Sequence, residues 1–187
     1  EGDGVLVVVD GGIRSAADRV AASCADAGLR VSVEVVPAGE ASKTMGEVER
    51  LSRAAARAGI RRRDVVVAVG GGVVGDLAGF LAAAYQRGVR LVQVPTTLLA
   101  MVDSSLGGKT GVDLPEGKNY VGAIYQPEAV VMDPSVLGTL SRRELSCGFA
   151  EVVKYGLLEG GELMEIVAAW PDLPGPPAEL ADLIRRC

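Results

Sequence analysis

The chain alternates between short apolar runs and longer segments in which apolar positions recur every three or four residues. Short runs rich in Val and Leu that stop at Gly, Pro or Asp are typical of buried parallel strands, and the longer period is typical of helices that cover them. The predicted strands are residues 5–9, 31–36, 65–69, 91–94 and 129–132. The predicted helices between them are residues 15–27, 44–59 and 77–85. This alternation predicts an α/β fold with a Rossmann-like parallel sheet and flanking helices.

Two of these helices begin with residues at the spacing of a capping box. Ser15 and Asp18 stand three apart at the first helix, and Thr44 and Glu47 do so at the second. In such a pair the first side chain accepts a hydrogen bond from the backbone N–H of the second residue, which satisfies a free donor of the first turn. We therefore expect both helices to be capped by their own side chains.

The segment 65–80 joins a strand to a glycine turn and a helix start. It reads VVVAVGGGVVGDLAGF, in which Gly70, Gly72 and Gly75 fit the G-x-G-x-x-G pattern. In that context the free N–H groups of the turn and the positive end of the helix favour a pyrophosphate. The acidic residue that usually binds the ribose about twenty residues further on is missing from the sequence. A turn that needs glycine only for its own conformation is the alternative interpretation.

Further polar candidates follow the first two strands. Asp10 comes directly after the first strand, and Glu40 comes in the loop after the second. In a parallel sheet the carboxyl ends of the strands lie along one edge, where α/β proteins bind their ligands. The pattern predicts one binding region, here called the mouth, that collects Asp10, Glu40 and the glycine turn.

Residues 103–119, DSSLGGKTGVDLPEGKN, are predicted to form a long irregular loop. Four glycines, a proline and two lysines are typical of turns, and loops of this length in compact domains are usually functional or disordered. Gly108, Lys109 and Thr110 resemble the end of a P-loop, but Asp103 stands where that motif requires its first glycine. The sequence therefore argues against nucleoside triphosphate binding through a P-loop.

A further helix is predicted over residues 143–158. It places Glu151 and Lys154 three residues apart, on one face of the helix. From spacing alone, an ordinary surface ion pair is the simpler interpretation of these two residues. The proline-rich residues 171–177 are expected to interrupt the helical pattern before a last helical fragment.

Composition narrows the class of function. Aromatic residues make up only 4% of the 187 residues, against 49% apolar residues, which favours parallel strands covered by helices. A net charge of −5 without a basic stripe argues against nucleic-acid binding. No apolar run is long enough to span a membrane. Three widely spaced cysteines favour a reduced, cytoplasmic setting.

The chain closely resembles the 3-dehydroquinate synthase family in the segments GGGVVGDLAGF, YQRGVRLVQVPTTLLAMVDSSLGGKTGVDLPEGKN, YQP and GFAEVVKYGLL. The resemblance covers about residues 10–158, in order and with matching spacing. It implies an NAD-binding α/β domain over residues 1–140, followed over residues 141–187 by the start of a helical domain that binds metal and substrate. It also implies a homodimer that acts on a small phosphorylated sugar acid.

Members of that family bind NAD and Zn²⁺ and convert 3-deoxy-arabino-heptulosonate 7-phosphate to 3-dehydroquinate in the shikimate pathway. The resemblance implies that the C5 hydroxyl is oxidised by hydride transfer to NAD, which acidifies the neighbouring C6 proton. Phosphate then leaves, the hydride returns, and ring opening permits an aldol closure. NAD is thus regenerated in each cycle, and zinc would polarise the hydroxyl that is oxidised.

The resemblance also assigns roles to individual residues. The positions that match cofactor-binding positions are Asp10, Gly39, Glu40, Lys43, Gly71, Gly72, Val73, Val74, Gly75, Asp76, Thr96, Thr97, Lys109, Lys118 and Thr139. Those that match substrate-contacting, catalytic positions are Asp103, Lys109, Asn119, Lys154 and Arg87. In the family, the residue at the position of Arg87 reaches the substrate phosphate from a neighbouring subunit. The cations among them suit a substrate that carries a carboxylate and a phosphate.

The chain departs from the family pattern at the metal. Glu151 matches the carboxylate ligand of the metal, but the family completes its site with two histidines, and this chain contains none. Because Zn²⁺ needs about three protein ligands, the site for Zn²⁺ (or Co²⁺) is expected to be incomplete. We therefore expect the N-terminal portion of a longer synthase, which binds NAD weakly and has no activity alone.

Three alternatives stay open on the sequence. A sister sugar-phosphate cyclase, such as an amino-dehydroquinate or deoxy-inosose synthase, would share the cofactor site, although DSSLGGKTGV and GKNYVG favour the dehydroquinate type. A polyol dehydrogenase of the iron-containing group also has a triple glycine but would produce net NADH. A non-catalytic NAD-binding module is the third, and the presence of Glu151 and Lys154 argues against it.

Overall fold

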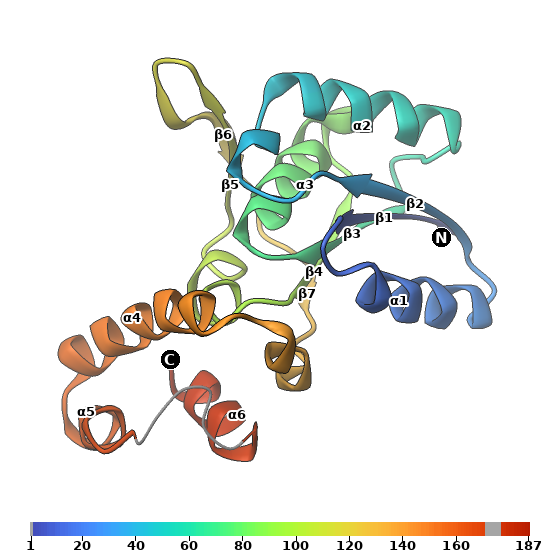
Figure 1. The fold of residues 1–187 in the computed structure, drawn as a ribbon. Helices are drawn as coiled ribbons and strands as arrows, with labels where there is room; N and C mark the ends of the chain where they lie inside the picture. The colour runs from blue at the N-terminus through green and yellow to red at the C-terminus, as the bar shows by residue number, and fades with distance from the viewer. Residues whose placement is uncertain (1, 171–176) are drawn as a thin grey trace.

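The computed structural model describes residues 2–170 and 177–187 and has a parallel sheet at its centre (Figure 1). The strands lie in the order β2-β1-β3-β4-β7, and each neighbouring pair is parallel. Their bounds are Gly4–Asp10 (β1), Arg30–Val36 (β2), Val65–Gly70 (β3), Arg90–Pro95 (β4) and Ala129–Val130 (β7). The predicted Rossmann-like sheet is confirmed, although β7 is shorter than predicted.

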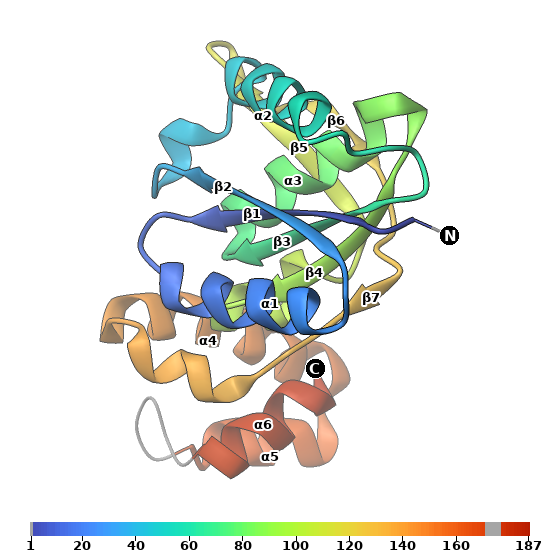
Figure 2. The same ribbon diagram turned by 90° about the vertical axis from the view of Figure 1, so that its right-hand side faces the viewer.

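Helices cover both faces of this sheet, as Figure 2 shows. They are α1 (Arg14–Asp26) on one face and α2 (Met45–Arg57) and α3 (Gly72–Ala84) on the other. Successive side chains of a strand point to opposite faces, so Val7 of β1 packs with α1, whereas Leu6 and Val8 pack with α2 and α3. Because both faces are buried, the strands are continuously apolar instead of alternating.

The capping box predicted from Ser15 and Asp18 is wrong. Ile13 is the N-cap residue of α1, and no side chain caps the helix. Asp10 organises the turn instead, since its carbonyl accepts a hydrogen bond from the Ile13 N–H at 3.1 Å and its carboxylate accepts one from the Gly12 N–H at 2.8 Å. This turn starts the helix ahead of Ser15, so the serine lies inside the first turn.

Side chains do cap two other helices. At α2 the Thr44 hydroxyl accepts a hydrogen bond from the Glu47 N–H at 3.2 Å, as predicted. Helix α4 (Arg142–Glu159) begins with a complete capping box, in which Ser141 Oγ accepts from the Glu144 N–H and the Glu144 carboxylate accepts from the Ser141 N–H at 2.8 Å. Each cap satisfies backbone donors that the helix leaves free.

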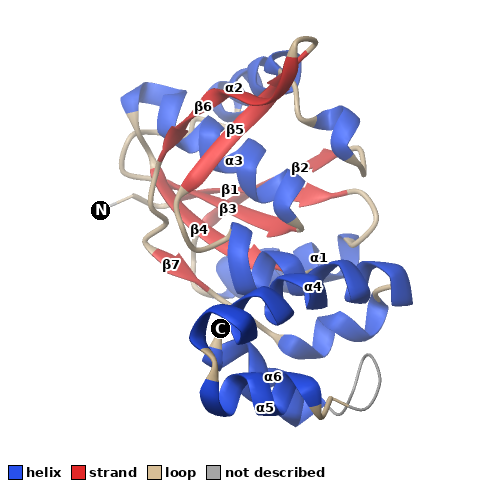
Figure 3. Ribbon diagram, turned by 90° about the vertical axis from the view of Figure 1, so that its left-hand side faces the viewer, coloured by secondary structure: helices blue, strands red, loops and turns tan. Residues whose placement is uncertain are grey.

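The irregular loop predicted over residues 103–119 is largely wrong, because much of it folds as a β-hairpin. β5 (Lys109–Leu114) pairs antiparallel with β6 (Gly117–Ile124), and the hairpin lies across α3 (Figure 3). Gly79 of α3 permits this close approach, since a Cβ there would lie 2.4 Å from Thr110 Cγ2. The polar and glycine-rich composition hid the strands, because much of β6 is exposed and carries no apolar stripe.

The chain after β7 is mainly helical and gathers beside the sheet (Figures 1 and 3). Its helices are α4, α5 (Gly161–Ala168) and α6 (Pro177–Arg186). They share one apolar core, which includes Leu145, Leu163 and Leu183 and also takes in Leu98 and Met101 from the segment after β4. Helix α4 confirms the helix predicted there. The predicted break at residues 171–177 falls outside the described residues except for its last residue, and the domain boundary at residue 140 stays a prediction.

Ser141→Ala should destabilise the protein by about 1 kcal/mol, because the first turn of α4 loses its cap. Hydrogen bonds from the Ser141 side chain and backbone hold the pKa of the Glu144 carboxyl below its ordinary value of 4.5. Such a shift gives stability that is present above the ordinary pKa and is lost as the pH falls through the lowered pKa. In urea unfolding, the difference in free energy of unfolding between the wild type and the variant should therefore shrink from neutral to acidic pH. An unfolding difference that stays constant across this range would contradict the role of the capping box.

Candidate functional site

The polar groups that follow β1, β3 and β4 lie along one edge of the sheet. The strand register aligns the carboxyl ends of these strands, so that Asp10 and the glycine turn stand side by side. Next to them, the Thr96 N–H donates a hydrogen bond to the Gly70 carbonyl at 2.9 Å, which fixes the end of β4 against the turn. The fold therefore brings the strand-end members of the predicted mouth together.

The glycine turn has room for little besides backbone. Gly71 is the N-cap residue of α3, and no side chain caps this helix. A Cβ on Gly71 would lie 3.0 Å from Thr97 Cγ2, and a Cβ on Gly72 would lie 3.1 Å from Ser104 Oγ. An uncapped first turn with its N–H groups and positive helix end fits an anionic group such as a pyrophosphate.

Two buried side chains, Val74 and Gln93, pack against this turn. Val74 packs under Gly70, where a Cβ would lie 2.7 Å from the Val74 Cβ. Gln93 of β4 is 5% exposed, and its amide donates a hydrogen bond to the Gly75 carbonyl at 3.2 Å. The sequence reasoning missed Gln93, although a glutamine inside an otherwise apolar strand was a usable signal. The Gly75 backbone is thus held by Gln93 and Val74 packs against Gly70, while the cofactor contacts predicted for Val73, Val74 and Gly75 stay predictions.

Lys43 lies at the centre of the polar contacts, with only 4% of its side chain exposed. Its Nζ donates one hydrogen bond to Asp76 Oδ2 at 2.7 Å and another to Asn119 Oδ1. Asp76 belongs to α3 and Asn119 to β6, so one ammonium ties the turn before α2 to the start of α3 and to the hairpin. The ammonium of Lys43 is thus engaged within the protein, and its predicted contact with a cofactor stays a prediction.

The Asp76 carboxyl is 19% exposed and feels several charges of the site. Burial raises its pKa, and the hydrogen bond and positive charge of Lys43 oppose that rise. The Glu40 carboxylate also raises the pKa, whereas the Lys109 ammonium lowers it. The pKa of Asp76 therefore depends on charged groups of the 40–43 turn and of the hairpin.

The hairpin is fastened to the 40–43 turn at further points. The Asp113 N–H donates a hydrogen bond to the Lys43 carbonyl at 2.8 Å, and Lys118 Nζ forms an ion pair with Glu40 at 3.1 Å. Asn119 has a φ of +57°, and its N–H donates to the Asp113 carboxylate at 2.8 Å. These contacts hold Asn119 in a backbone conformation that residues other than glycine rarely adopt.

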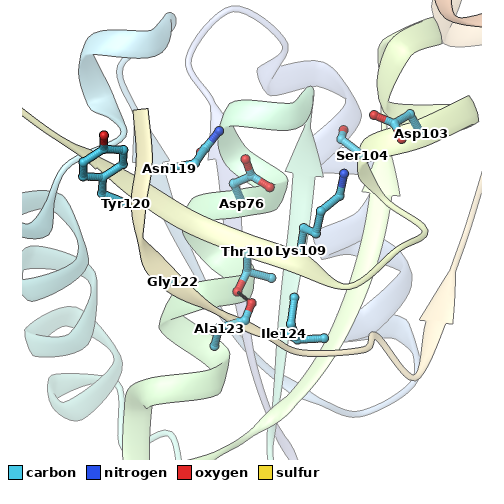
Figure 4. A pocket seen from close by; sticks show the side chains of 10 residues that line it. All are labelled: Asp76, Asp103, Ser104, Lys109, Thr110, Asn119, Tyr120, Gly122, Ala123 and Ile124. Carbon is cyan, nitrogen blue, oxygen red and sulfur yellow. Dashed lines mark hydrogen bonds between the residues drawn. The ribbon is translucent and has the colours of Figure 1, made fainter. Parts of the chain in front are cut away.

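A cavity of about 490 Å³ lies between α3, the hairpin and the π-helical turn Ala100–Ser104 (Figure 4). Asp103, Lys109 and Asn119, for which the family resemblance implies substrate contact, all line this cavity. Asp76 lines the cavity too. Because Asp76 directly follows Gly75 of the glycine turn, the cavity adjoins the mouth. The structure therefore brings the predicted cofactor region and these predicted substrate residues to one shared wall.

Two other predicted positions, Arg87 and Thr139, do not line this cavity and belong to other elements than the glycine turn. Arg87 follows the far end of α3, about 20 Å from the glycine turn for a helix of 13 residues. Thr139 ends the 3₁₀ turn Pro134–Thr139, and its hydroxyl donates to the Val136 carbonyl at 2.7 Å. Their predicted contacts with substrate and cofactor stay predictions.

Glu151 and Lys154 form an ion pair on one face of α4, as their spacing predicts. The side chains are 19% and 49% exposed, and Lys154 Nζ also lies 4.7 Å from the centre of the Tyr155 ring. Within residues 2–170 and 177–187, no three His, Cys, Asp or Glu side chains are grouped so that they could hold a metal ion. The residues present therefore do not by themselves fit a zinc centre. Among the helices in the described part of the chain, none is both long and apolar enough to cross a membrane.

Comparison with known proteins gives a family match that includes the glycine turn and the hairpin. Residues 33–147, more than half of the chain, match the family model described as "3-dehydroquinate synthase N-terminal". The 3-dehydroquinate synthase of Symbiobacterium thermophilum is 54% identical over 165 residues, which cover 87% of this chain and 46% of that protein. The chain thus spans about half the length of the curated relatives it matches.

Solved structures agree with the fold. The structure of a 2-deoxy-scyllo-inosose synthase complexed with carbaglucose-6-phosphate, NAD⁺ and Co²⁺ is 32% identical, with a TM-score of 0.86 over 99% of this chain and 52% of that one. A 2-epi-5-epi-valiolone synthase from Streptomyces hygroscopicus with NAD⁺ and Zn²⁺ bound is 32% identical, with a TM-score of 0.78 over 98% of this chain and 53% of that one.

Lys43→Met should destabilise the protein by about 1–3 kcal/mol, because Asp76 and Asn119 lose a shared donor in a largely buried place. Backbone amides of β6 should also exchange with solvent faster in this variant, since the hairpin loses one of its fastenings. Urea unfolding and hydrogen exchange measure the two effects.

Lys118→Met is the matched control for this prediction. Its ammonium is exposed and its pair with Glu40 lies at the surface, so the loss should stay below about 1 kcal/mol. Equal effects of the two substitutions would contradict the central role of Lys43.

Proposed function

This chain belongs to the 3-dehydroquinate synthase family, and from that premise we propose that it carries the NAD-binding part and much of the substrate cavity of such an enzyme. The reaction converts 3-deoxy-arabino-heptulosonate 7-phosphate to 3-dehydroquinate and phosphate, with NAD regenerated in each cycle. One observation carries the proposal: the glycine turn and the cavity lined by Asp103, Lys109 and Asn119 meet at Asp76.

The mouth suits NAD in an extended pose along the edge of the sheet. Backbone N–H groups of Gly72 and Val73 would bind the pyrophosphate at the positive end of α3. Asp10 and Glu40, on the β1 and β2 side, would accept hydrogen bonds from the adenosine ribose. This arrangement supplies the acidic groups that the usual position in the sequence lacks. Bound NAD supplies the hydride acceptor for oxidation of a substrate hydroxyl.

The cavity suits the anionic sugar acid. Lys109 contributes a positive charge, and Asn119 offers an amide whose orientation is set by Lys43. Asp103 can accept a hydrogen bond from a substrate hydroxyl and so orient the carbon that is oxidised. Lys154 would add a second cation from α4. Their combined charge favours binding of a ligand with both a carboxylate and a phosphate.

Other parts of the proposed enzyme depend on groups that these described residues do not supply. Glu151 would be one metal ligand, and we derive no catalytic step from a metal because the described residues do not complete its shell. Arg87, at the far end of α3, would reach the substrate phosphate in the cavity of a second subunit in a homodimer. The free Cys24, Cys147 and Cys187 support a reducing, cytoplasmic location.

A sister sugar-phosphate cyclase is the second candidate function, because solved relatives of that kind share the fold at a TM-score of 0.86. Identity favours the first candidate, since the chain is 54% identical to a 3-dehydroquinate synthase but 32% identical to a 2-deoxy-scyllo-inosose synthase. The sister enzyme would use the same mouth and a different polar pattern in the cavity.

Gly72→Val should weaken NAD binding to this chain by about tenfold or more, because the side chain would extend toward Ser104 and block the pyrophosphate from backbone donors. Isothermal titration with NAD measures the loss. Gly156→Ala in α4 is the control, since the new Cβ would meet only ordinary contacts at 3.4 Å or more. Unchanged NAD affinity in Gly72→Val would contradict pyrophosphate binding at the turn.

Activity can be tested in a chimera that joins residues 1–187 to the C-terminal part of the Symbiobacterium thermophilum relative beyond the matched region. We expect release of phosphate from the heptulosonate phosphate, without net NADH, and no turnover by the 187 residues alone. Glu151→Ala in the chimera is expected to abolish turnover. Preference for glucose 6-phosphate would indicate a sister cyclase, and net NADH production would indicate a dehydrogenase.

A further inference from the structure

The π-helical turn Ala100–Ser104 brings two consecutive polar side chains, Asp103 and Ser104, to the cavity. Isolated π-helical turns are rare and often occur at functional sites, because they shift which side chains face a ligand. The sequence reasoning assigned a role to Asp103 but none to Ser104. Figure 4 shows both side chains at the same end of the cavity as Lys109.

Ser104 stands directly beside the glycine turn. Its Oγ lies 3.1 Å from the place that a Cβ on Gly72 would occupy. In the described part of the chain its hydroxyl has no hydrogen-bond partner. It lines the cavity together with Lys109, whose ammonium favours anions. An unpartnered hydroxyl beside a cation and an uncapped helix start is suited to an anionic oxygen.

Strand order indicates which part of a dinucleotide would lie there. In the order β2-β1-β3-β4, the acids Asp10 and Glu40 belong to the β1 and β2 side of the glycine turn, and Ser104 follows β4 on the opposite side. A dinucleotide with its adenosine near the acids and its pyrophosphate on the turn would therefore place its second half beside Ser104.

We propose that Ser104 is a further cofactor-binding residue, whose hydroxyl donates a hydrogen bond to the nicotinamide-side phosphate of NAD. The inference rests on the proposed function, because it takes the mouth to be an NAD site. A phosphate oxygen only accepts hydrogen bonds, so the hydroxyl would act as the donor. It would complement the backbone N–H groups of α3 from the other side of the phosphate.

Ser105 provides a matched control within the same turn of chain. It is 4% exposed, and its Oγ is buried without a hydrogen-bond partner in the described residues. Ser105 therefore has the same side chain one residue further on, pointing into the protein interior instead of toward a ligand. Ser105→Ala makes the same chemical change, the loss of one hydroxyl, but should not alter NAD affinity.

The test is titration of this chain with NAD and with AMP, at concentrations high enough to saturate a weak site. Ser104→Ala should weaken NAD binding about tenfold, as expected for a hydrogen bond to a charged group, while Ser105→Ala stays within about twofold. The AMP affinity of Ser104→Ala and of Ser105→Ala should equal that of the wild type, because AMP lacks the nicotinamide-side phosphate. Ser104→Cys keeps the shape of the side chain with a slightly larger, weakly donating thiol, and it should behave like Ser104→Ala.

The outcomes separate the two proposals. If the wild-type chain binds NAD and Ser104→Ala binds it equally well, the assignment of Ser104 is overturned and the proposed function stands. If Ser104→Ala weakens AMP and NAD alike, Ser104 does not contact the nicotinamide-side phosphate. If the wild-type chain binds no NAD, the proposed NAD site and the assignment of Ser104 both fail. Circular dichroism of each variant checks that the fold is retained.

Discussion

The buried ammonium of Lys43 is the interaction on which the geometry of this site depends. It joins Asp76 at the start of α3 to Asn119 on the hairpin, two groups that are 43 positions apart in the sequence. A buried lysine is costly unless it is paired and hydrogen-bonded, and here both partners are also candidate ligand-binding groups. The side chains that stabilise the ammonium therefore cannot move independently of one another.

This arrangement would let a small α/β unit hold the two proposed ligands side by side. The mouth uses the strand ends and the start of α3, where backbone donors favour a pyrophosphate. The cavity uses the other side of α3, where the hairpin adds Lys109 and Asn119. Because Asp76 belongs to both, a cofactor and a substrate bound there would meet at one wall. The helical part adds Glu151 and Lys154 on α4, and its apolar core is shared with the segment after β4.

The parallel sheet could be predicted from the sequence because its strands are buried on both faces and therefore appear as continuous apolar runs, of which residues 65–69 are the clearest. The mouth followed from topology, since the strand ends of a parallel sheet must share an edge. The hairpin could not be predicted in this way, because β6 is mostly exposed and its partner approaches α3 through Gly79. The start of α1 was missed because the Asp10 turn overrides the local preference of Ser15.

The features of the site that the sequence did not predict depend on long-range contacts. No local pattern indicates that Lys43 would turn inward to Asp76 and Asn119, or that a π-helical turn would aim Ser104 at the cavity. Both depend on how the hairpin and the segment after β4 pack on α3.

The most direct measurement is a crystal structure of this chain with NAD. We expect the pyrophosphate within hydrogen-bond distance of the Gly72 and Val73 N–H groups, with the nicotinamide facing the cavity that Asp76 and Lys109 line. A dinucleotide bound on another surface, or one whose nicotinamide points away from that cavity, would contradict it.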